Sequence, residues 1–347
     1  MFGIIARVRR FFNSWEFDLA CMYAAGVFDS DGINKARAYA KEFKRNKDIY
    51  KRHKLPPEIY NGKKIYNKDE ANKIIGDAIL KGDPFMAARY GSCELSAFTK
   101  VKNNNKGFCC PYSSALMHLC RDIAGFFPED KNELIKFADL MKKSTKQVNL
   151  MGVWFNPLEE YILRTFGNDP DYCHLGALEP FSSKDPWSAK LEGKKVLVIH
   201  PFYKTIPEQY KKREKLFNGE NILPDFELIM QPAVQTIGGT RDERFKTWFE
   251  ALNYMFDEAM KKNFDVAIIG CGAYGFPLAA KLKQAGKIVI HLGGATQLLF
   301  GIIGKRWEND PEYYEFFSKY FNNGYWVRPD ESETPANKQR FENGCYW

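Results

Sequence analysis

The run of residues 264–307, FDVAIIGCGAYGFPLAAKLKQAGKIVIHLGGATQLLFGIIGKRW, constrains the fold more than any other stretch of the chain. Four apolar residues at 266–269 predict a buried strand, and a glycine turn then leads into a helix over residues 277–284. Residues 288–291 predict a second strand, which ends in another glycine turn. This order of strand, helix and strand predicts a βαβ unit with parallel strands.

The first glycine turn, GCGAYG at residues 270–275, satisfies the G-x-G-x-x-G pattern of dinucleotide-binding turns. Such sites also need an Asp or Glu about 20 residues further on, where it binds the ribose hydroxyls. Here the next strand ends in His291, and the turn lies late in the chain. We therefore expect neither NAD nor FAD. Backbone N–H groups and the helix dipole still suit the turn to a phosphate, and tight packing is the alternative role of its glycines.

The rest of the chain alternates strand-like and helix-like segments. Strands are expected at residues 84–89, 148–154, 174–178, 195–200 and 226–231, and helices at 69–80, 95–100, within 113–143 and at 244–262. This alternation predicts an α/β fold, a Rossmann-like, mostly parallel sheet flanked by helices. A chain of 347 residues suffices for one large α/β domain with additions or for two domains.

Composition indicates a folded globular protein, because 45% of the residues are hydrophobic and 15% are aromatic. The sequence contains no apolar run of membrane-spanning length and no signal-peptide pattern, so we expect a cytoplasmic location. The eight cysteines form no C-x-x-C pair, which favours reduced thiols.

The net charge of +8 is concentrated near the N-terminus. Residues 1–68 hold 15 Lys and Arg against 7 Asp and Glu, and the remaining residues hold 36 of each kind. We therefore expect a basic helical extension at residues 1–69, with Pro56 and Pro57 near its end, and an electrically neutral catalytic or binding domain at 70–329. Residues 330–347 are expected to form a polar tail.

The first 20 residues predict an amphipathic helix. On a helical projection six apolar side chains share one face: Ile4, Val8, Phe11, Phe12, Trp15 and Leu19. With the arginines around them they suit the surface of an anionic membrane, and would place the protein at its inner face. Packing on the domain or on another subunit is the alternative. No nucleic-acid motif accompanies the basic residues, so no nucleic acid is expected.

Polar residues at the C-terminal ends of predicted strands are candidate ligand contacts, because open parallel sheets bind ligands there. Glu94, Trp154, Glu179 and His200 occupy such positions. The alternative for each is a helix cap or a turn.

Residues 89–95, RYGSCEL, resemble the opening of the GT-D glycosyltransferases, bacterial enzymes of surface-polysaccharide and glycoprotein assembly. In that family the turn carries a D-x-E motif that supports a divalent metal and the nucleotide-sugar. The βαβ unit resembles the family's C-terminal half, and HLGG, LFGIIGKRW and the Pro186-Trp187 pair resemble a subgroup encoded with capsule or lipopolysaccharide enzymes. The resemblance covers roughly residues 70–310.

The chain departs from the family's pattern at two acids. Ser92 replaces the first acid of D-x-E, and His291 stands where the late strand ends in an acid. Both changes weaken a site for Mg²⁺ or Mn²⁺, which such sites hold by carboxylates and substrate phosphates. Glu94 remains as the candidate metal ligand.

The resemblance implies a hexosyltransferase-like enzyme that moves a sugar from a nucleoside-diphosphate sugar to a glycan or lipid-linked acceptor. Such transfer needs a base for the acceptor hydroxyl and groups that stabilise the departing diphosphate. Glu94 is the first candidate base, followed by Glu179 and His200. The donor and its phosphates are expected to contact Arg89, Tyr90, Gly91, Ser92, Gly270, Gly272, Tyr274, Gly275, His291, Gly293, Gly294, Gln297, Lys305 and Arg306.

Other interpretations of these residues stay open. Arg89 suits a structural salt bridge, Tyr90 and Trp154 suit core packing, and Lys305 and Arg306 suit a solvated helix end. A pyruvyl or acyl transferase of the same pathways is one alternative function. A non-catalytic protein that binds sugars or nucleotides is another, suggested by the aspartate missing at Ser92.

Overall fold

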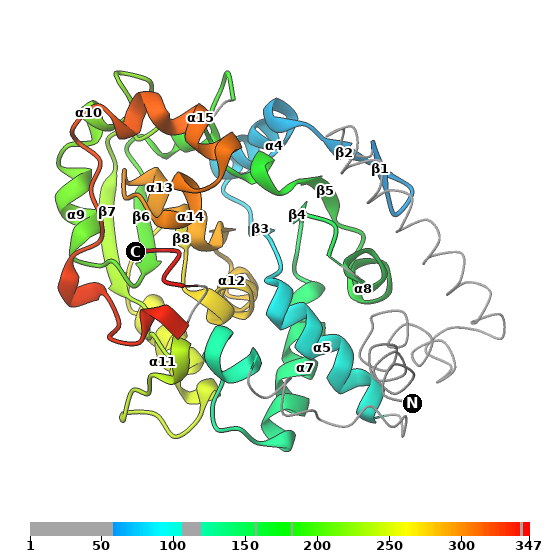
Figure 1. Cartoon of the computed structure of the whole chain (residues 1–347). Coiled ribbons are helices and arrows are strands. Elements are labelled where there is room, and N and C mark those ends of the chain that lie inside the picture. Colours follow the sequence, from blue (N-terminus) through cyan, green and yellow to red (C-terminus); the bar gives the residue numbers. More distant parts are fainter. Residues whose placement is uncertain (1–57, 106–118, 157, 182, 341–342) are drawn as a thin grey trace, which may run out of the picture.

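The computed structural model describes residues 58–105, 119–156, 158–181, 183–340 and 343–347, and a sheet of nine strands runs through them (Figure 1). The strands are β1 (Ile59–Tyr60), β2 (Lys63–Tyr66), β3 (Phe85–Ala88), β4 (Leu150–Val153), β5 (Asp171–His174), β6 (Lys195–His200), β7 (Glu227–Pro232), β8 (Val266–Ile269) and β9 (Ile288–His291). The α-helices are α4 (Lys68–Lys81), α5 (Ser92–Asn105), α7 (Lys131–Thr145), α8 (Glu159–Phe166), α9 (Thr205–Tyr210), α10 (Arg213–Leu216), α11 (Trp248–Met260), α12 (Gly275–Gln284), α13 (Thr296–Leu299), α14 (Lys305–Glu308) and α15 (Pro311–Phe321).

The strands lie in the order β1-β2-β5-β4-β3-β9-β8-β6-β7. β1 is antiparallel to β2, and every other pair of neighbours is parallel. β9 lies between β3 and β8, where Ile288 is in register with both Phe85 and Val266. The predicted α/β class and mostly parallel sheet are therefore confirmed.

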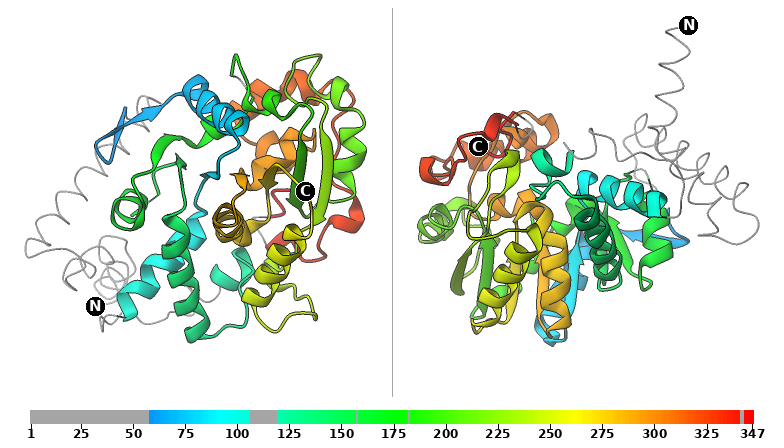
Figure 2. Two further views of the ribbon diagram at one scale, coloured as in Figure 1. Left: turned by 180° about the vertical axis from the view of Figure 1, so that it is seen from behind. Right: turned by 90° about the horizontal axis from the view of Figure 1, so that it is seen from below.

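Helices cover both faces of the sheet (Figures 1 and 2). Alternate strand residues point to opposite faces, so Met86 packs in one core and Phe85 in the other. Helices α5, α7, α8, α11 and α12 contribute to the first core, and α4, α9, α13 and α15 to the second. Because both faces are buried, β8 and β9 are runs of four buried residues each, as parallel sheets require.

Local sequence signals explain several element boundaries. α4 begins with a capping box, in which the side chains of Asn67 and Glu70 each accept the other's backbone N–H, and it ends at Gly82 with φ 83°. α11 begins at Trp248 and not at residue 244, because the side chain of Thr247 caps it by accepting the Glu250 N–H.

The strand expected at residues 174–178 is wrong in position. β5 starts at Asp171 and ends at His174, and Leu175–Leu178 forms a 3₁₀ turn instead. Ala177 and Leu178 are buried by this turn against the side of the sheet that α4 covers. Apolar residues therefore continue past the strand end, which explains why the apolar pattern placed the strand too late.

The last residues of the chain pack closely against the segments that follow β9. Cys345 and Trp347 are buried, the Arg306 N–H donates to the Cys345 carbonyl oxygen at 2.8 Å, and Gln297 Nε2 donates to that of Tyr346 at 3.3 Å. Towards the N-terminus, strands β1 and β2 place residues 59–66 in the sheet, so the sheet begins before residue 70, where the main domain was expected to start.

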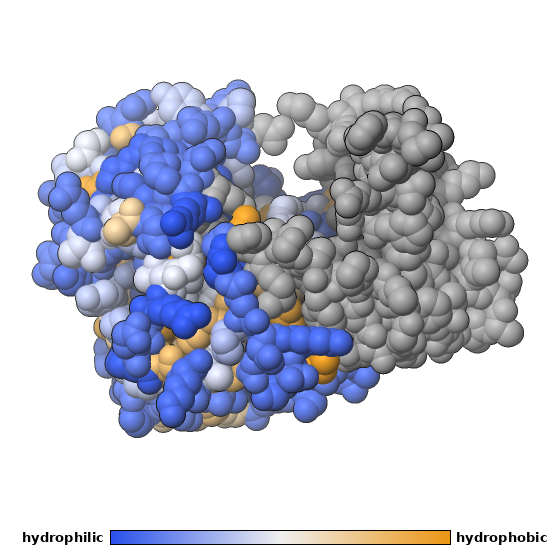
Figure 3. All heavy atoms as spheres, turned by 60° about the horizontal axis from the view of Figure 1, so that its bottom comes forward, coloured by the Kyte–Doolittle hydropathy of each residue, from blue (hydrophilic) through white to orange (hydrophobic). Residues whose placement is uncertain are grey.

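The basic helix expected at residues 1–20 and the boundary near Pro56 lie outside the described residues. Within the described part of the chain, none of the helices combines the length and apolar character needed to cross a membrane. The coloured part of the face in Figure 3 is mostly hydrophilic, and its hydrophobic side chains form small groups.

Candidate functional site

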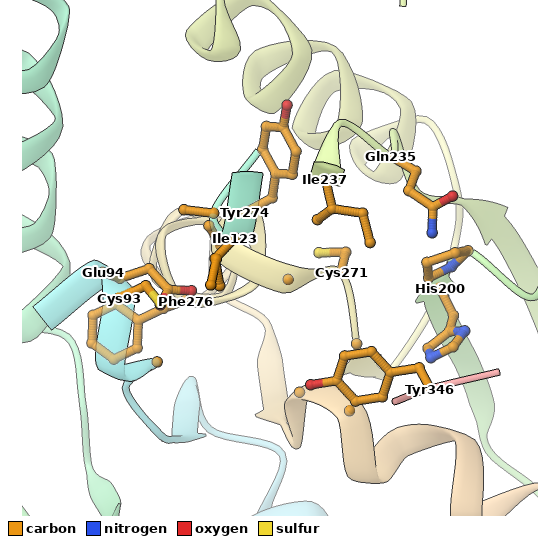
Figure 4. A pocket seen from close by; sticks show the side chains of 18 of the residues that line it. Cys93, Glu94, Ile123, His200, Gln235, Ile237, Cys271, Tyr274, Phe276 and Tyr346 are labelled. Atoms are coloured by element: carbon orange, nitrogen blue, oxygen red, sulfur yellow. The ribbon is translucent and has the colours of Figure 1, made fainter. Parts of the chain in front are cut away.

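A cavity lies at the C-terminal edge of the parallel strands, with about 1110 Å³ of empty volume including its opening to solvent. Its walls come from the segments that follow β3, β4, β6, β7, β8 and β9. Figure 4 shows Glu94 and Cys93 on one side of the cavity and His200 and Gln235 on the other. This is the edge at which open α/β sheets bind ligands.

The connections of two neighbouring strands diverge at this edge. β6 leads outward to β7, whereas β8 leads through α12 in the opposite direction to β9. Such a switch point opens a crevice between the strands. Ile199 of β6 is in register with Ile269 of β8, so His200 and Gly270 meet at the crevice.

The cavity gathers most of the residues that the sequence predicted for the site. Those that line it are Arg89, Gly91, Ser92, Glu94, His200, Gly270, Gly272, Tyr274, His291, Gly293, Gly294, Gln297 and Arg306. Tyr90, Glu179, Gly275 and Lys305 do not line it. The RYGSCEL turn and the glycine turn of the βαβ unit, far apart in the chain, therefore share one site.

Glu94 lies in the first turn of α5 and folds back over Gly91. A Cβ atom added to Gly91 would collide with the Glu94 carboxylate, so the carboxylate depends on a glycine at that position. An acidic group at a helix N-terminus also stabilises the helix dipole. Glu94 thus combines a structural position with a place on the cavity wall.

Arg89 follows β3 and supplies a cation to the cavity. Its guanidinium lies over the ring of Trp154, 5.1 Å from the centroid. Among the described residues, no side chain or carbonyl forms an ion pair or a hydrogen bond with this guanidinium. The charge of Arg89 also lowers the pKa of the buried Glu179 carboxyl group, which does not line the cavity. A guanidinium on a cavity wall that forms no ion pair is suited to a carboxylate or phosphate ligand.

Glu159 fixes the position of Trp154. Its Oε2 atom accepts the backbone N–H of Trp154 at 3.2 Å and that of Asn156 at 3.3 Å, and the Tyr60 hydroxyl donates to it at 3.4 Å. The carboxyl group is fully buried, and burial raises its pKa to about 7 although the hydrogen bonds lower it. Sequence analysis missed this residue, because nothing in the segment WFNPLEEY distinguishes the first of its two glutamates as the buried one.

His200 faces the cavity as a neutral imidazole. Its Nδ1 atom accepts the backbone N–H of Phe202 at 3.0 Å, and burial lowers the pKa of the ring to about 3. The single proton of the neutral ring therefore resides on Nε2, where the ring is a hydrogen-bond donor. This arrangement does not suit the role of base that the sequence suggested for it.

His291 ends β9 and is 2% exposed. Neither ring nitrogen has a hydrogen-bond partner among the described residues, although buried polar groups normally have one. The ring lies so close to Gly275 that a Cβ atom there would collide with Nε2. Burial, together with the charge of Arg89, lowers the pKa of His291 to about 3, although a contact with the Arg89 backbone that falls outside hydrogen-bond geometry raises it, so the ring is neutral.

The wall beside Gly294 is built by Tyr346, whose ring occupies the space that a side chain at position 294 would need. The Arg306 guanidinium donates to the Tyr346 hydroxyl at 2.9 Å and lies over its ring, 4.7 Å from the centroid. Gln297 donates through Nε2 to the carbonyl oxygens of Ile302 and Tyr346, at 3.2 and 3.3 Å. Gln297 therefore holds the wall together through backbone contacts.

Sequence analysis did not predict two parts of the cavity wall, the segment after β7 and Tyr346. Gln235 and Thr236 follow β7 and line the cavity. The Thr236 and Tyr274 hydroxyl oxygens are 2.9 Å apart, and the Tyr274 ring stacks on Trp248 at a centroid distance of 4.6 Å. Tyr274 thus lines the site as a packed residue. Neither Gln235 nor Tyr346 belongs to a recognisable motif, so the sequence offered no signal for them.

Three of the predicted residues outside the cavity have other contacts. Tyr90 is fully buried, with its hydroxyl 2.5 Å from Thr145 Oγ1, so its ring is not available to stack on a ligand. Glu179 accepts the Tyr313 hydroxyl at 2.7 Å, and burial raises the pKa of its carboxyl group to about 7. Lys305 is exposed at the start of α14.

The expected divalent cation is poorly matched by the donor groups of the cavity. Mg²⁺ and Mn²⁺ favour carboxylate and phosphate oxygens. Among the described residues that line the cavity, Glu94 provides the only carboxylate. Over the described ranges as a whole, no three His, Cys, Asp or Glu side chains come together as a metal site.

No protein-family model and no curated protein matches this chain. Two solved structures are similar to it. One shows the highly conserved domain of unknown function 1792, described as having a distinct glycosyltransferase fold; it is 13% identical, with a TM-score of 0.37 over 68% of this chain and 78% of the other. The second, a selenomethionine-substituted structure of domain of unknown function 1792, is 12% identical, with a TM-score of 0.39 over 67% of this chain and 79% of the other. Likeness at this level carries no argument about what the chain does.

Proposed function

We propose that the protein is a glycosyltransferase that uses a nucleoside-diphosphate sugar. One observation carries the proposal: a single cavity joins the RYGSCEL turn at the start of α5 to the glycine turn at the start of α12. The first of these segments carries the resemblance to GT-D glycosyltransferases, and the second is suited to phosphate. Both lie where an α/β sheet binds its ligands.

In this proposal the donor's diphosphate lies against the start of α12 and the Arg89 guanidinium. The bond between the anomeric carbon and the diphosphate oxygen breaks during transfer, and negative charge then develops on the departing nucleoside diphosphate. An arginine cation and helix-terminal N–H groups stabilise such charge where it develops. Trp154, held by Glu159, keeps Arg89 at the cavity wall.

Glu94 is the proposed general base. It accepts the proton of the acceptor hydroxyl while that oxygen forms its bond to the anomeric carbon. His200 donates a hydrogen bond from Nε2, which suits an oxygen of the donor. The acceptor is proposed to be a glycan, carried on a lipid that residues 1–20 would bring within reach.

The test is a panel of nucleoside-diphosphate sugars, measured by melting temperature and by release of the nucleoside diphosphate, with and without Mn²⁺. We expect at least one donor to raise the melting temperature and to be slowly hydrolysed even without acceptor. Glu94→Gln should abolish turnover and keep donor binding, because the amide cannot take up the proton.

Glu192→Gln is the matched control, since Glu192 is exposed and does not line the cavity. It should behave as the wild type does. If no donor in the panel shifts the melting temperature, the proposal fails. Hydrolysis that persists unchanged in Glu94→Gln would remove Glu94 from its role.

A further inference from the structure

The charges that line the cavity suit an anion better than a metal ion. Glu94 is the one carboxylate side chain among the described residues that line the cavity, which also holds the guanidinium groups of Arg89 and Arg306. The Arg306 guanidinium is engaged by Tyr346, whereas that of Arg89 forms no ion pair among the described residues, although its charge acts on the buried carboxyl group of Glu179 outside the cavity. Arg89 is therefore the cation that a ligand would meet.

His291 lies next to this cation and is poised to bind a ligand. Arg89 Nη1 would be 3.2 Å from a Cβ atom on Gly293, two residues after His291, so the guanidinium lies at the turn that follows the histidine. Both ring nitrogens of His291 are buried without a partner. A neutral imidazole donates one hydrogen bond and accepts another, so a ligand oxygen would satisfy its N–H group.

The start of α12 completes this corner of the cavity. The His291 ring packs against Gly275, the first residue of that helix, and the preceding Gly272–Tyr274 turn lines the cavity. α12 has ten residues, and its dipole presents partial positive charge at this end, although the Gly275 N–H donates to the Gly272 carbonyl oxygen and Pro277 has no N–H. Three independent groups, a cation, an unpartnered imidazole and a helix N-terminus, thus converge.

We propose that Arg89, His291 and the start of α12 form a subsite that binds a pyrophosphoryl group without a divalent cation. The proposal rests on the proposed function for the identity of the ligand, the diphosphate of a sugar nucleotide. In this subsite the fixed guanidinium supplies the positive charge that a bound metal ion would otherwise contribute. A divalent cation beside Arg89 would be repelled and would find one carboxylate, Glu94, on the cavity wall.

The experiment measures the affinity of the full chain for inorganic pyrophosphate by calorimetry, once in EDTA and once with Mn²⁺. We expect binding in EDTA, with no more than about a twofold gain from Mn²⁺. Arg89→Ala should weaken binding about 10- to 100-fold, because a charge-assisted contact is lost. Arg164→Ala is the matched control, since Arg164 is exposed on α8, away from the cavity, and should bind pyrophosphate as the wild type does.

A second variant keeps the test decisive if Arg89→Ala does not fold. His291→Asp places a carboxylate beside Arg89 and should reduce binding in EDTA at least about tenfold, because the new charge neutralises the cation. Binding that appears only with Mn²⁺, or that neither substitution weakens, would overturn the inference. If no nucleotide-sugar in the panel binds, the proposed glycosyltransferase function is refuted. The subsite is tested separately, because pyrophosphate binding in EDTA needs no sugar donor.

Discussion

Gly270→Ala is a sharp test of how tightly the crevice between β6 and β8 is built. A Cβ atom at Gly270 would lie 2.6 Å from His200 Cδ2, 2.7 Å from the Gly293 carbonyl oxygen and 2.7 Å from Thr296 Oγ1. All three distances are shorter than real Cβ contacts. None of these atoms is the end of a flexible side chain, and the Gly270 N–H is fixed to the Ile199 carbonyl oxygen at 3.0 Å.

The substitution must therefore displace either His200 or the turn after β9. Inserting a methyl group into a well-packed interior costs about 1–3 kcal/mol, and three simultaneous contacts place this case at about 2–3 kcal/mol. For a chain of 347 residues, whose unfolding entropy is about 2.1 cal/mol/K per residue, that lowers the melting temperature by about 3–4 °C. Scanning calorimetry measures the shift, and we expect pyrophosphate binding to weaken with it because the cavity wall moves.

Gly176→Ala is the matched control for this substitution. Gly176 has no atom within 4 Å of an added Cβ atom, so alanine should leave the melting temperature unchanged or raise it slightly. If Gly270→Ala has the same melting temperature as Gly176→Ala and binds pyrophosphate as the wild type does, the inference that the crevice is closely packed around Gly270 is refuted.

Two other predictions concern acid and membranes. Burial lowers the pKa of His200 and His291 from 6.5 to about 3, so the unfolded chain binds protons that the folded chain excludes, and the stability present above pH 6.5 declines as the pH falls toward 3. Between about pH 7 and pH 5 the free energy of unfolding, measured in urea, should fall by about 2 kcal/mol less in His291→Gln than in the wild type. Equal decreases in the two proteins would contradict a neutral, buried His291. Deletion of residues 1–20 should release the protein from anionic vesicles in a sedimentation assay, and undiminished binding would exclude the interfacial helix.

The strands of the sheet follow from local sequence. Continuous apolar runs such as those of β6, β8 and β9 are typical of strands buried on both faces, and glycine turns mark where they end. The order of the strands does not follow in the same way. Insertion of β9 between β3 and β8 depends on packing between residues about 200 positions apart, which no local pattern encodes.

The site was predictable where a residue ends a strand or begins a helix. Arg89, Glu94, His200 and His291 stand at such places, and the sheet brings all four to one edge. Glu159 could not be found, because its function depends on burial and on contacts with Trp154 and Tyr60. The chemistry of His200 likewise depends on a backbone N–H two residues later, which only the folded turn brings to Nδ1.

The position of β9 also bears on how the protein is made. Before β9 is added, residues 59–174 supply one half-sheet that ends at β3, and residues 195–269 supply another that ends at β8. A nascent chain released from the ribosome before residue 288 would carry two open apolar strand edges, which invite aggregation. Ile288–His291 joins the halves and, through its last residue, also completes the cavity. Ligand binding would therefore occur only after β9 has been synthesised and has paired with both halves of the sheet.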